Sequence, residues 1–327
     1  MAVPVKVNKI SCPTTAKILE RIYVRWDKSL AATSYVLERK ADDGDYTIVY
    51  SGSERNYIDD VNSSWNVVNY RVKVVNTDGE SGYTESEDIE IIYCEIDSKG
   101  LLYPYNFIVD FSQSQFDVLP DVKDTTEELI GIDGEYLIET LYEPRLFDIV
   151  ANSQIVSIDE RMKLISNLGK VFNCFKSSER LFRYNGKLYK AKLGEKPSIE
   201  TYPNWITLEL TLKAYYPYGY SETHILSDSG TAENSGDEEI YPIFKITGEV
   251  TNPVITVNDV SYTLLYTLAE TDTVTIDCEN KTVTLNDTTN VLNYWGTDFP
   301  IFSVGDNTIS ISNGSLKTYW KDKYICL

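Results

Sequence analysis

Histidine, cysteine pairs and long apolar runs are scarce in this chain, and each scarcity argues against a class of function. The 327 residues include one histidine, His224, so we expect no catalytic triad and no ordinary first-row metal site. Five cysteines lie far apart without a CxxC pair, which predicts reduced thiols in a protein made in a cytoplasm. No run of about 18 apolar residues occurs, and the first residues lack the apolar core of a secretion signal. We therefore expect no membrane insertion.

Positive charge is also in short supply. Lys and Arg number 30 against 50 Asp and Glu, which gives a formal net charge of −20. The excess is greatest in residues 223–327, which carry 5 basic and 15 acidic side chains. Such a surface disfavours nucleic-acid backbones and anionic membranes as partners, and its simplest interpretation is solubility.

Sequence motifs for catalysis or cofactor binding are missing too. There is no Walker loop and no dinucleotide-binding fingerprint. The acidic segment Asp42–Asp45 lacks the alternating ligands and closing Glu of an EF-hand loop, so it predicts a hairpin turn. Carboxylates are abundant, but none lies in a recognisable glycosidase context. His224 is expected to be a solvated loop histidine. We therefore predict a protein that is not an enzyme, with no catalytic, cofactor-binding or metal-binding residues.

Residues 1–95 consist of short alternating segments separated by turns, at the ~8–12-residue spacing of a β-sandwich. The expected strands cover 17–26, 35–39, 46–50, 57–59, 70–76 and 89–93. The motifs V-R-W-D at 24–27 and Y-R-V-K-V-V-N-x-x-G at 70–79 resemble a fibronectin type III domain. Trp65, Tyr83 and Tyr93 are interpreted either as stacking platforms for a glycan or as core residues.

Residues 96–235 contain the one convincing helix, predicted over 158–168. Ser157 and Glu160 have the spacing of a capping box, and Gly169 suits a C-cap. Further along, Asn185-Gly186 predicts a tight β-hairpin. Other expected features are a start at Leu101–Pro104, a turn at Gly131–Gly134, a strand at 205–212, and an aromatic strand end formed by Tyr215, Tyr216, Tyr218 and Tyr220. For these tyrosines, packing onto the domain is favoured over stacking on sugars.

An acidic linker is predicted at 227–239, and a second β-sandwich at 236–327. Its motifs are Y-P-x-F-x-I-x-G at 241–248, N-P-x-I at 252–255, T-I-D-C-E-N-K-T-V at 275–283 and F-P-x-x-x-x-G-x-N-x-I at 299–309. Their order resembles the galectin-like C-terminal domain of the distal tail proteins of tailed bacteriophages. The preceding G-x-D-G-E-Y, N-G-K-L-Y-K-A and Y-Y-P-Y-G segments resemble the ring-forming domain of the same family, so the resemblance covers about 96–327.

The resemblance implies a mainly β fold class in three domains: a fibronectin III-like β-sandwich at 1–95, a ring-forming β-rich domain with one helix at 96–235, and a galectin-like β-sandwich at 236–327. It implies a structural protein of the virion tail tip, made in the bacterial host cytoplasm, in a phage, prophage or tail-like bacteriocin. A homo-oligomer, expected to be a hexameric ring, would join the tail tube protein to the hub protein and dock receptor-binding proteins.

Two further possibilities stay open at this stage. A host cell-wall glycan is a candidate ligand of the 1–95 block. The alternative function is an extracellular adhesin or carbohydrate-binding protein built from tandem β-sandwiches. A signal peptide and a wall-anchoring segment would favour that alternative, and neither pattern is seen in the sequence.

Overall fold

The computed structural model describes residues 3–18, 20–62, 65–96, 107–116, 118–128, 133, 135–154, 157–296 and 298–326. Strands dominate these residues and α1 is their one α-helix, which confirms the predicted mainly β fold class. Two compact units divide the chain, Met1–Pro217 and Tyr218–Leu327. The three-domain division drawn from the sequence stays a prediction. The segment Leu101–Pro104, and the turn Gly131–Gly134 apart from Asp133, lie outside the described residues.

The first unit begins with two facing sheets. The smaller sheet is antiparallel, in the order β1 (Ile10–Ser11), β3 (Arg21–Trp26) and β6 (Asn56–Asp60). The larger contains β2 (Thr15–Lys17), β4 (Ser34–Ala41), β5 (Thr47–Gly52), β7 (Val67–Asn76), β8 (Gly79–Glu80), β9 (Thr84–Glu85) and β10 (Ile89–Ile96). Exposed and buried residues alternate along β3, and buried positions recur at every second residue of β7. This period of two places one face of each sheet in a common core.

A second group of strands continues the larger sheet instead of forming a separate one. These strands are β11 (Ile108–Val109), β12 (Gln115–Phe116), β15 (Arg145–Gln154), β16 (Arg180–Tyr184), β17 (Lys187–Leu193), β18 (Ser198–Thr201) and β19 (Trp205–Ala214). The path runs β11-β15-β19-β17-β16-β10-β7-β4-β5, and β10 pairs with β16 in parallel. The predicted hairpin is confirmed, because Asn185 (φ 49°) and Gly186 (φ 75°) both have positive φ between β16 and β17.

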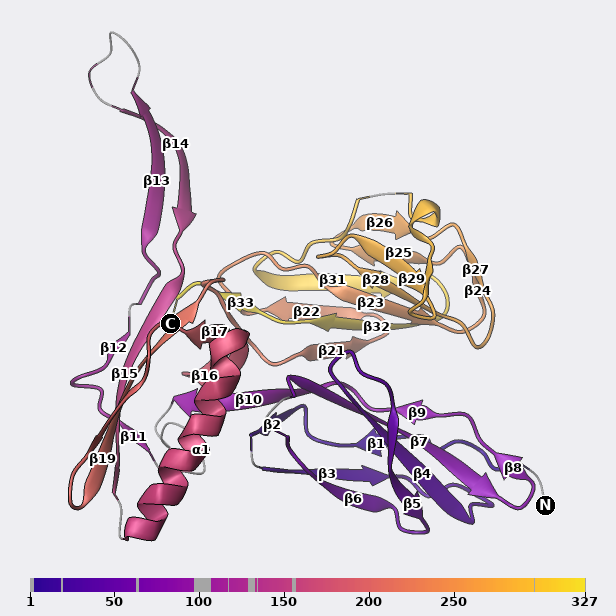
Figure 1. Cartoon of the computed structure of the whole chain (residues 1–327). Helices are drawn as coiled ribbons and strands as arrows, with labels where there is room; N and C mark the ends of the chain where they lie inside the picture. Colours follow the sequence, from indigo (N-terminus) through magenta and orange to yellow (C-terminus); the bar gives the residue numbers. More distant parts are fainter. Residues whose placement is uncertain are drawn as a thin grey trace. The chain divides into compact units, whose positions relative to one another are not determined.

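Helix α1 (Ile158–Ser177) lies along this sheet and contacts β17 (Figure 1). Its predicted capping box is confirmed: the amide of Glu160 donates to Ser157 Oγ at 3.2 Å, and the amide of Ser157 donates to Glu160 Oε2 at 3.1 Å. The predicted C-cap at Gly169 is wrong, because the helix continues to Ser177. Its buried face is formed by Leu164, Leu168, Val171 and Phe172, which recur at helical spacing across Gly169.

The second unit is a sandwich of a six-stranded and a four-stranded antiparallel sheet. The larger has the order β21 (His224–Ser227), β32 (Ser315–Trp320), β23 (Ile243–Thr247), β28 (Thr273–Asp277), β29 (Thr282–Leu285) and β30 (Thr289–Asn290). The smaller has the order β22 (Gly230–Asn234), β31 (Gly305–Ile311), β25 (Val254–Val257) and β26 (Val260–Thr263). Short elements complete the unit: β20 (Gly219–Tyr220), β24 (Val250–Thr251), β27 (Thr267–Leu268), η1 (Leu292–Tyr294) and β33 (Lys323–Tyr324).

The predicted linker at 227–239 is wrong, because much of it is part of this sandwich. Gly230–Asn234 forms β22 and pairs with β31. Two residues further on, the amide of Gly236 donates a hydrogen bond to the side chain of Asn234. The Asn234 side chain is itself buried and donates to the backbone of Glu238. In β22 the side chain of Glu233 is exposed, while Ala232 and Asn234 are buried. The polar composition typical of a linker therefore comes from the exposed side of a strand.

Candidate functional site

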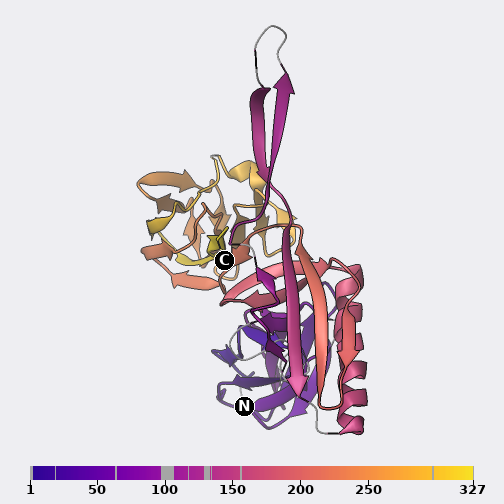
Figure 2. The same cartoon turned by 90° about the vertical axis from the view of Figure 1, so that its left-hand side faces the viewer.

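The most unusual surface of the first unit is a β-hairpin formed by β13 (Val122–Glu128) and β14 (Glu135–Tyr142). The two strands pair only with each other, and both views show them standing clear of the central sheet (Figures 1 and 2). Every residue of β14 is exposed. Its large apolar side chains are exposed by 64% (Tyr136), 54% (Leu137), 55% (Ile138), 53% (Leu141) and 42% (Tyr142). We call this pair of strands the arm.

Apolar side chains occupy both faces of the arm. Leu137 lies opposite Thr126 and Tyr142 opposite Val122, whereas Leu141 lies opposite Lys123. Directly opposed residues share a face and neighbouring residues alternate along β13, so Val122 and Thr126 lie on one face and Lys123 on the other. Because the register shifts between Thr125 and Thr126, Leu137 shares a face with Tyr142, and Leu141 lies on the opposite face. An isolated two-stranded hairpin is marginally stable in water, and contiguous exposed apolar surface marks an interaction site. The arm is therefore a candidate interaction surface.

Acidic side chains surround these apolar residues. Residues 122–142 carry one basic side chain and six acidic ones, a net charge of −5. Thr140 Oγ1 donates to Asp124 Oδ1 at 2.6 Å across the two strands. The sequence analysis did not identify the arm as a site. The run Tyr136-Leu137-Ile138 was the available signal, since consecutive apolar residues place apolar side chains on both faces of a strand.

A second exposed apolar pair lies on α1. Ile158 and Met162, one helical turn apart, are exposed by 76% and 64%. Both recur at helical spacing with Ile165 and Leu168, but of these four residues Leu168 alone is buried. The buried stripe begins at Leu164, so the first turns of the helix extend past the sheet that covers its later turns.

His224 does not occupy the solvated loop predicted for it. It begins β21, its ring stacks on Trp320 with centroids 5.3 Å apart, and its Nε2 lies 3.1 Å from Oδ2 of Asp322. The Asp322 side chain is 3% exposed, against 45% for His224. The hydroxyl of Tyr324 donates to the same carboxylate oxygen at 3.3 Å. This arrangement gives a buried carboxylate two side-chain partners, His224 and Tyr324.

The remaining sequence candidates are divided between core and surface. Tyr93 is 1% exposed and so belongs to the core. The guanidinium groups of Arg39 and Arg71 lie 4.3 Å and 4.1 Å from the ring centroids of Trp65 and Tyr83, so each ring has one face covered by a cation. Tyr46 stacks on the other side of Arg71, and burial raises the pKa of Tyr46 to about 12.

The aromatic strand end and the acidic turn have ordinary surface positions. Tyr215 and Tyr216 are exposed by 54% and 46%, so the packing favoured from the sequence does not cover them. Asp42 forms the expected turn, and its Oδ1 accepts hydrogen bonds from the amides of Asn66 and Val67. Within the described ranges, no cluster of three His, Cys, Asp or Glu side chains could hold a metal ion. No described helix has the length and apolar character needed to cross a membrane.

One protein family matches part of the chain. Residues 235–324 match the family model described as the siphovirus-type tail component, C-terminal domain. A comparison with curated protein sequences finds no match. The family match coincides with the second sandwich, where the sequence motifs at 241–309 had indicated the same family.

One solved structure extends the likeness in fold beyond the second unit. The SPP1 Dit protein, described as a paradigm of the hub adsorption apparatus in phages infecting Gram-positive bacteria, has a TM-score of 0.52 at 11% identity, covering 66% of this chain and 93% of that chain. The phage P2 baseplate structure, activated with Ca, has a TM-score of 0.39 at 9% identity, covering 67% and 94%. The structure of FN3tt has a TM-score of 0.24 at 18% identity, covering 28% and 97%. The first likeness shows a common fold, and the other two are too weak to support an argument.

Proposed function

We propose that this chain, a siphovirus-type tail component by its residues 235–324, assembles with its copies into a closed hexameric ring at the tip of a phage tail. The ring would join the tail tube to the hub, and the second sandwich would dock receptor-binding proteins. The observation that carries the proposal is the arm, whose apolar side chains are exposed on both faces.

Burial of the arm against a neighbouring copy would supply the driving force for a ring. A Leu side chain contributes about 1.5–3 kcal/mol when it passes from full exposure to full burial. Leu137 and Leu141 are each about half exposed, at 54% and 53%, so each would contribute part of that amount. Tyr136 and Tyr142 add rings that pack while their hydroxyls stay in water, as is common at protein interfaces.

A closed ring requires that the arm meets a different surface on the next copy. The exposed pair Ile158 and Met162 on α1 is a candidate for that surface, because it is apolar and lacks cover in the single chain. Lys163 and Lys170 on the same helix are positive, as suits an arm with a net charge of −5.

The test compares the assembly of the full chain with that of an arm variant. Leu137→Thr combined with Leu141→Thr removes apolar surface and keeps side chains favourable in strands. The unchanged chain should form a species well above monomer by light scattering, and ring-shaped particles by negative-stain electron microscopy. The arm variant should shift to monomer with an unchanged unfolding midpoint.

The matched control is Ile48→Thr, which makes the same kind of change at a 66% exposed position on β5. It should assemble like the unchanged chain. The proposal is wrong if the arm variant assembles normally. It is also wrong if the unchanged chain stays monomeric both alone and when mixed with tail tube and hub proteins.

A further inference from the structure

A groove on the outer face of the central sheet has the features of a binding site for an oligosaccharide. Its hollow of about 480 Å³ is lined by Gln113, Asn152, Glu200, Tyr202, Trp205, Thr207 and Glu209. A second hollow of about 690 Å³ shares Asn152 and Trp205 with the first and adds the exposed side chains of Ile108 and Phe111. Trp205 is thus the wall common to both hollows.

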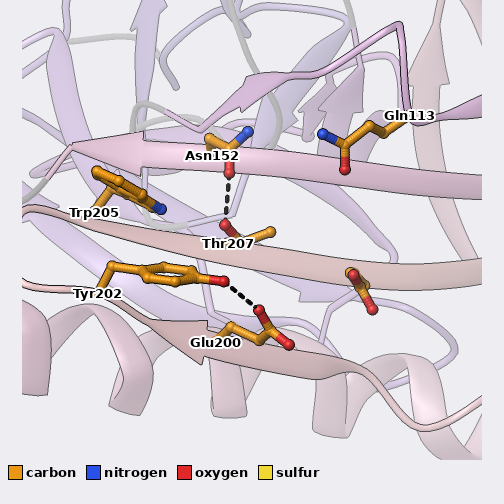
Figure 3. A pocket seen from close by; sticks show the side chains of 7 residues that line it. Gln113, Asn152, Glu200, Tyr202, Trp205 and Thr207 are labelled. Carbon is orange, nitrogen blue, oxygen red and sulfur yellow. Dashed lines mark hydrogen bonds between the residues drawn. The ribbon is translucent and has the colours of Figure 1, made fainter.

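Two exposed aromatic rings stand at one end of the groove. Trp205 and Tyr202 are exposed by 47% and 39%, and their ring centroids lie 5.0 Å apart with planes inclined by 31°. Figure 3 shows both rings at the end of the groove opposite Gln113. Trp205 keeps about half of its surface exposed beside Tyr202, so part of the indole is accessible to a ligand. The apolar C–H face of a pyranose ring packs well on such a surface.

The aromatic pair is held rigidly before any ligand binds. The amide of Tyr202 donates to the carbonyl of Trp205 at 2.9 Å and closes the turn. From α1, Arg161 Nη2 donates to the carbonyls of Tyr202 at 2.7 Å and Pro203 at 3.1 Å. The hydroxyl of Tyr202 donates to Glu200 Oε2 at 2.7 Å. Groups fixed in this way lose little conformational entropy on binding, which favours affinity.

The rest of the lining offers side chains that can donate and accept hydrogen bonds. Thr207 Oγ1 donates to Asn152 Oδ1 at 2.7 Å, which leaves the Asn152 amide nitrogen able to donate (Figure 3). Gln113 donates to Asp110 at 3.1 Å, and its carbonyl oxygen can accept. Among the described residues, the carboxylate of Glu209 has no hydrogen-bond or ion-pair partner. A few polar groups beside an aromatic wall are typical of ligand sites.

We propose that this groove binds a neutral or amino-sugar oligosaccharide of the kind present in bacterial cell walls. The carboxylates of Glu200 and Glu209 accept hydroxyl and amide hydrogens but repel phosphate and carboxylate groups. The chain's net charge of −20 acts in the same direction and excludes anionic wall polymers. The site lies on a single chain and does not depend on the proposed ring.

Binding is tested on the full chain with tetra-N-acetylchitotetraose as the neutral amino-sugar probe and poly(glycerol phosphate) as the anionic one, by calorimetry and NMR. The chitotetraose should bind with a dissociation constant in the millimolar range, and the poly(glycerol phosphate) should not bind. Trp205→Ala should weaken chitotetraose binding at least tenfold. Tyr215→Ala removes an aromatic ring of similar exposure outside the groove and should leave binding unchanged.

Further variants distinguish the site from other uses of this surface. Glu209→Gln should retain the neutral probe, because the amide oxygen still accepts hydrogen bonds, and should still not bind the anionic one, because Glu200 and the net negative charge of the chain remain. Absence of chitotetraose binding at millimolar concentration overturns the proposal, as does loss of binding in Tyr215→Ala with retention in Trp205→Ala. A Trp205→Ala chain that binds chitotetraose normally but no longer assembles would show that the groove seats a neighbouring copy instead.

Discussion

The guanidinium group of Arg180 lies over the ring of Tyr93, with its central carbon 5.0 Å from the ring centroid. Arg180 begins β16 in the central sheet, whereas Tyr93 is in β10, the last strand of the first sandwich. Arg180 also donates to the side chain of Asn66. The contact reinforces the parallel pairing of β10 with β16 and joins the N-terminal sandwich to the residues that carry the arm.

Arg180→Ala should lower the stability of the first unit by about 1–2 kcal/mol, from the loss of a cation–π contact and a hydrogen bond. Urea unfolding followed by circular dichroism measures the change. Lys190→Ala, at an exposed position on β17, is the control and should have little effect. Equal stability of the Arg180 variant and the unchanged chain would mean that this contact does not couple the two strand groups.

Deletion of residues 1–95 should yield a less stable remainder that aggregates as its concentration rises. The division between 1–95 and 96–235 drawn from the sequence implies the opposite, a remainder that folds by itself. The structure supplies a reason against that outcome, since the deletion removes β10 and leaves β16 with an unpaired strand edge. Thermal unfolding and light scattering of the truncated chain test this expectation. A soluble remainder with an unchanged melting temperature would support the boundary drawn from the sequence.

The shared strand explains why the sequence predicted individual strands better than their connection. Alternating residues at 70–76 and 89–93 identified β7 and β10 because one face of each is buried, and burial of one face leaves a period of two. The pairing of β10 with β16 joins residues separated by about ninety positions and depends on backbone groups. Such pairing leaves no local pattern in the side chains, so the sequence does not predict it.

His224→Ala should destabilise the second unit by about 1–2 kcal/mol, because it removes a partner from the buried Asp322 carboxylate. The solvated loop predicted from the sequence would imply no effect, and the stacking of His224 on Trp320 contradicts that prediction. His224→Gln retains a side-chain donor and should lose less stability. Guanidinium unfolding of both variants gives the comparison, and equal stability of His224→Ala with the unchanged chain would contradict the role assigned to this pair.

The cysteines should react with a maleimide in the order set by burial. Cys326 is exposed and should be modified first in the native protein. Burial raises the pKa of Cys94, Cys278 and Cys12, and a higher pKa leaves less of the reactive thiolate near pH 8. Cys94 and Cys278 should therefore stay unmodified until the chain unfolds, with Cys12 between the extremes. Peptide mapping by mass spectrometry measures each site, and rapid labelling of native Cys94 or Cys278 would contradict the packing described.

The candidate sites were less predictable from the sequence than the strands were. The acidic composition of 227–239 predicted a linker. Composition alone does not show that alternate residues of β22 within this segment are buried. Tyr202 and Trp205 come together because a turn places them side by side, and Arg161 reaches that turn from a distant helix. Contacts of this kind depend on the assembled fold, so the sequence predicted a strand starting at Trp205 but not a site formed by these residues.

Gly169→Ala should stabilise the first unit by about 0.5–1 kcal/mol, because alanine favours the interior of a helix over glycine. A Cβ at this position would meet no heavy atom within 4 Å, so the substitution needs no repacking. Gly186→Ala is the matched control: its Cβ would also meet nothing within 4 Å, but its φ of +75° disfavours alanine. The two variants should therefore shift the urea midpoint of the monomeric chain in opposite directions. A loss of stability in Gly169→Ala would contradict this account. It would indicate that Gly169 is the C-cap predicted from the sequence and that the helix ends before Val171.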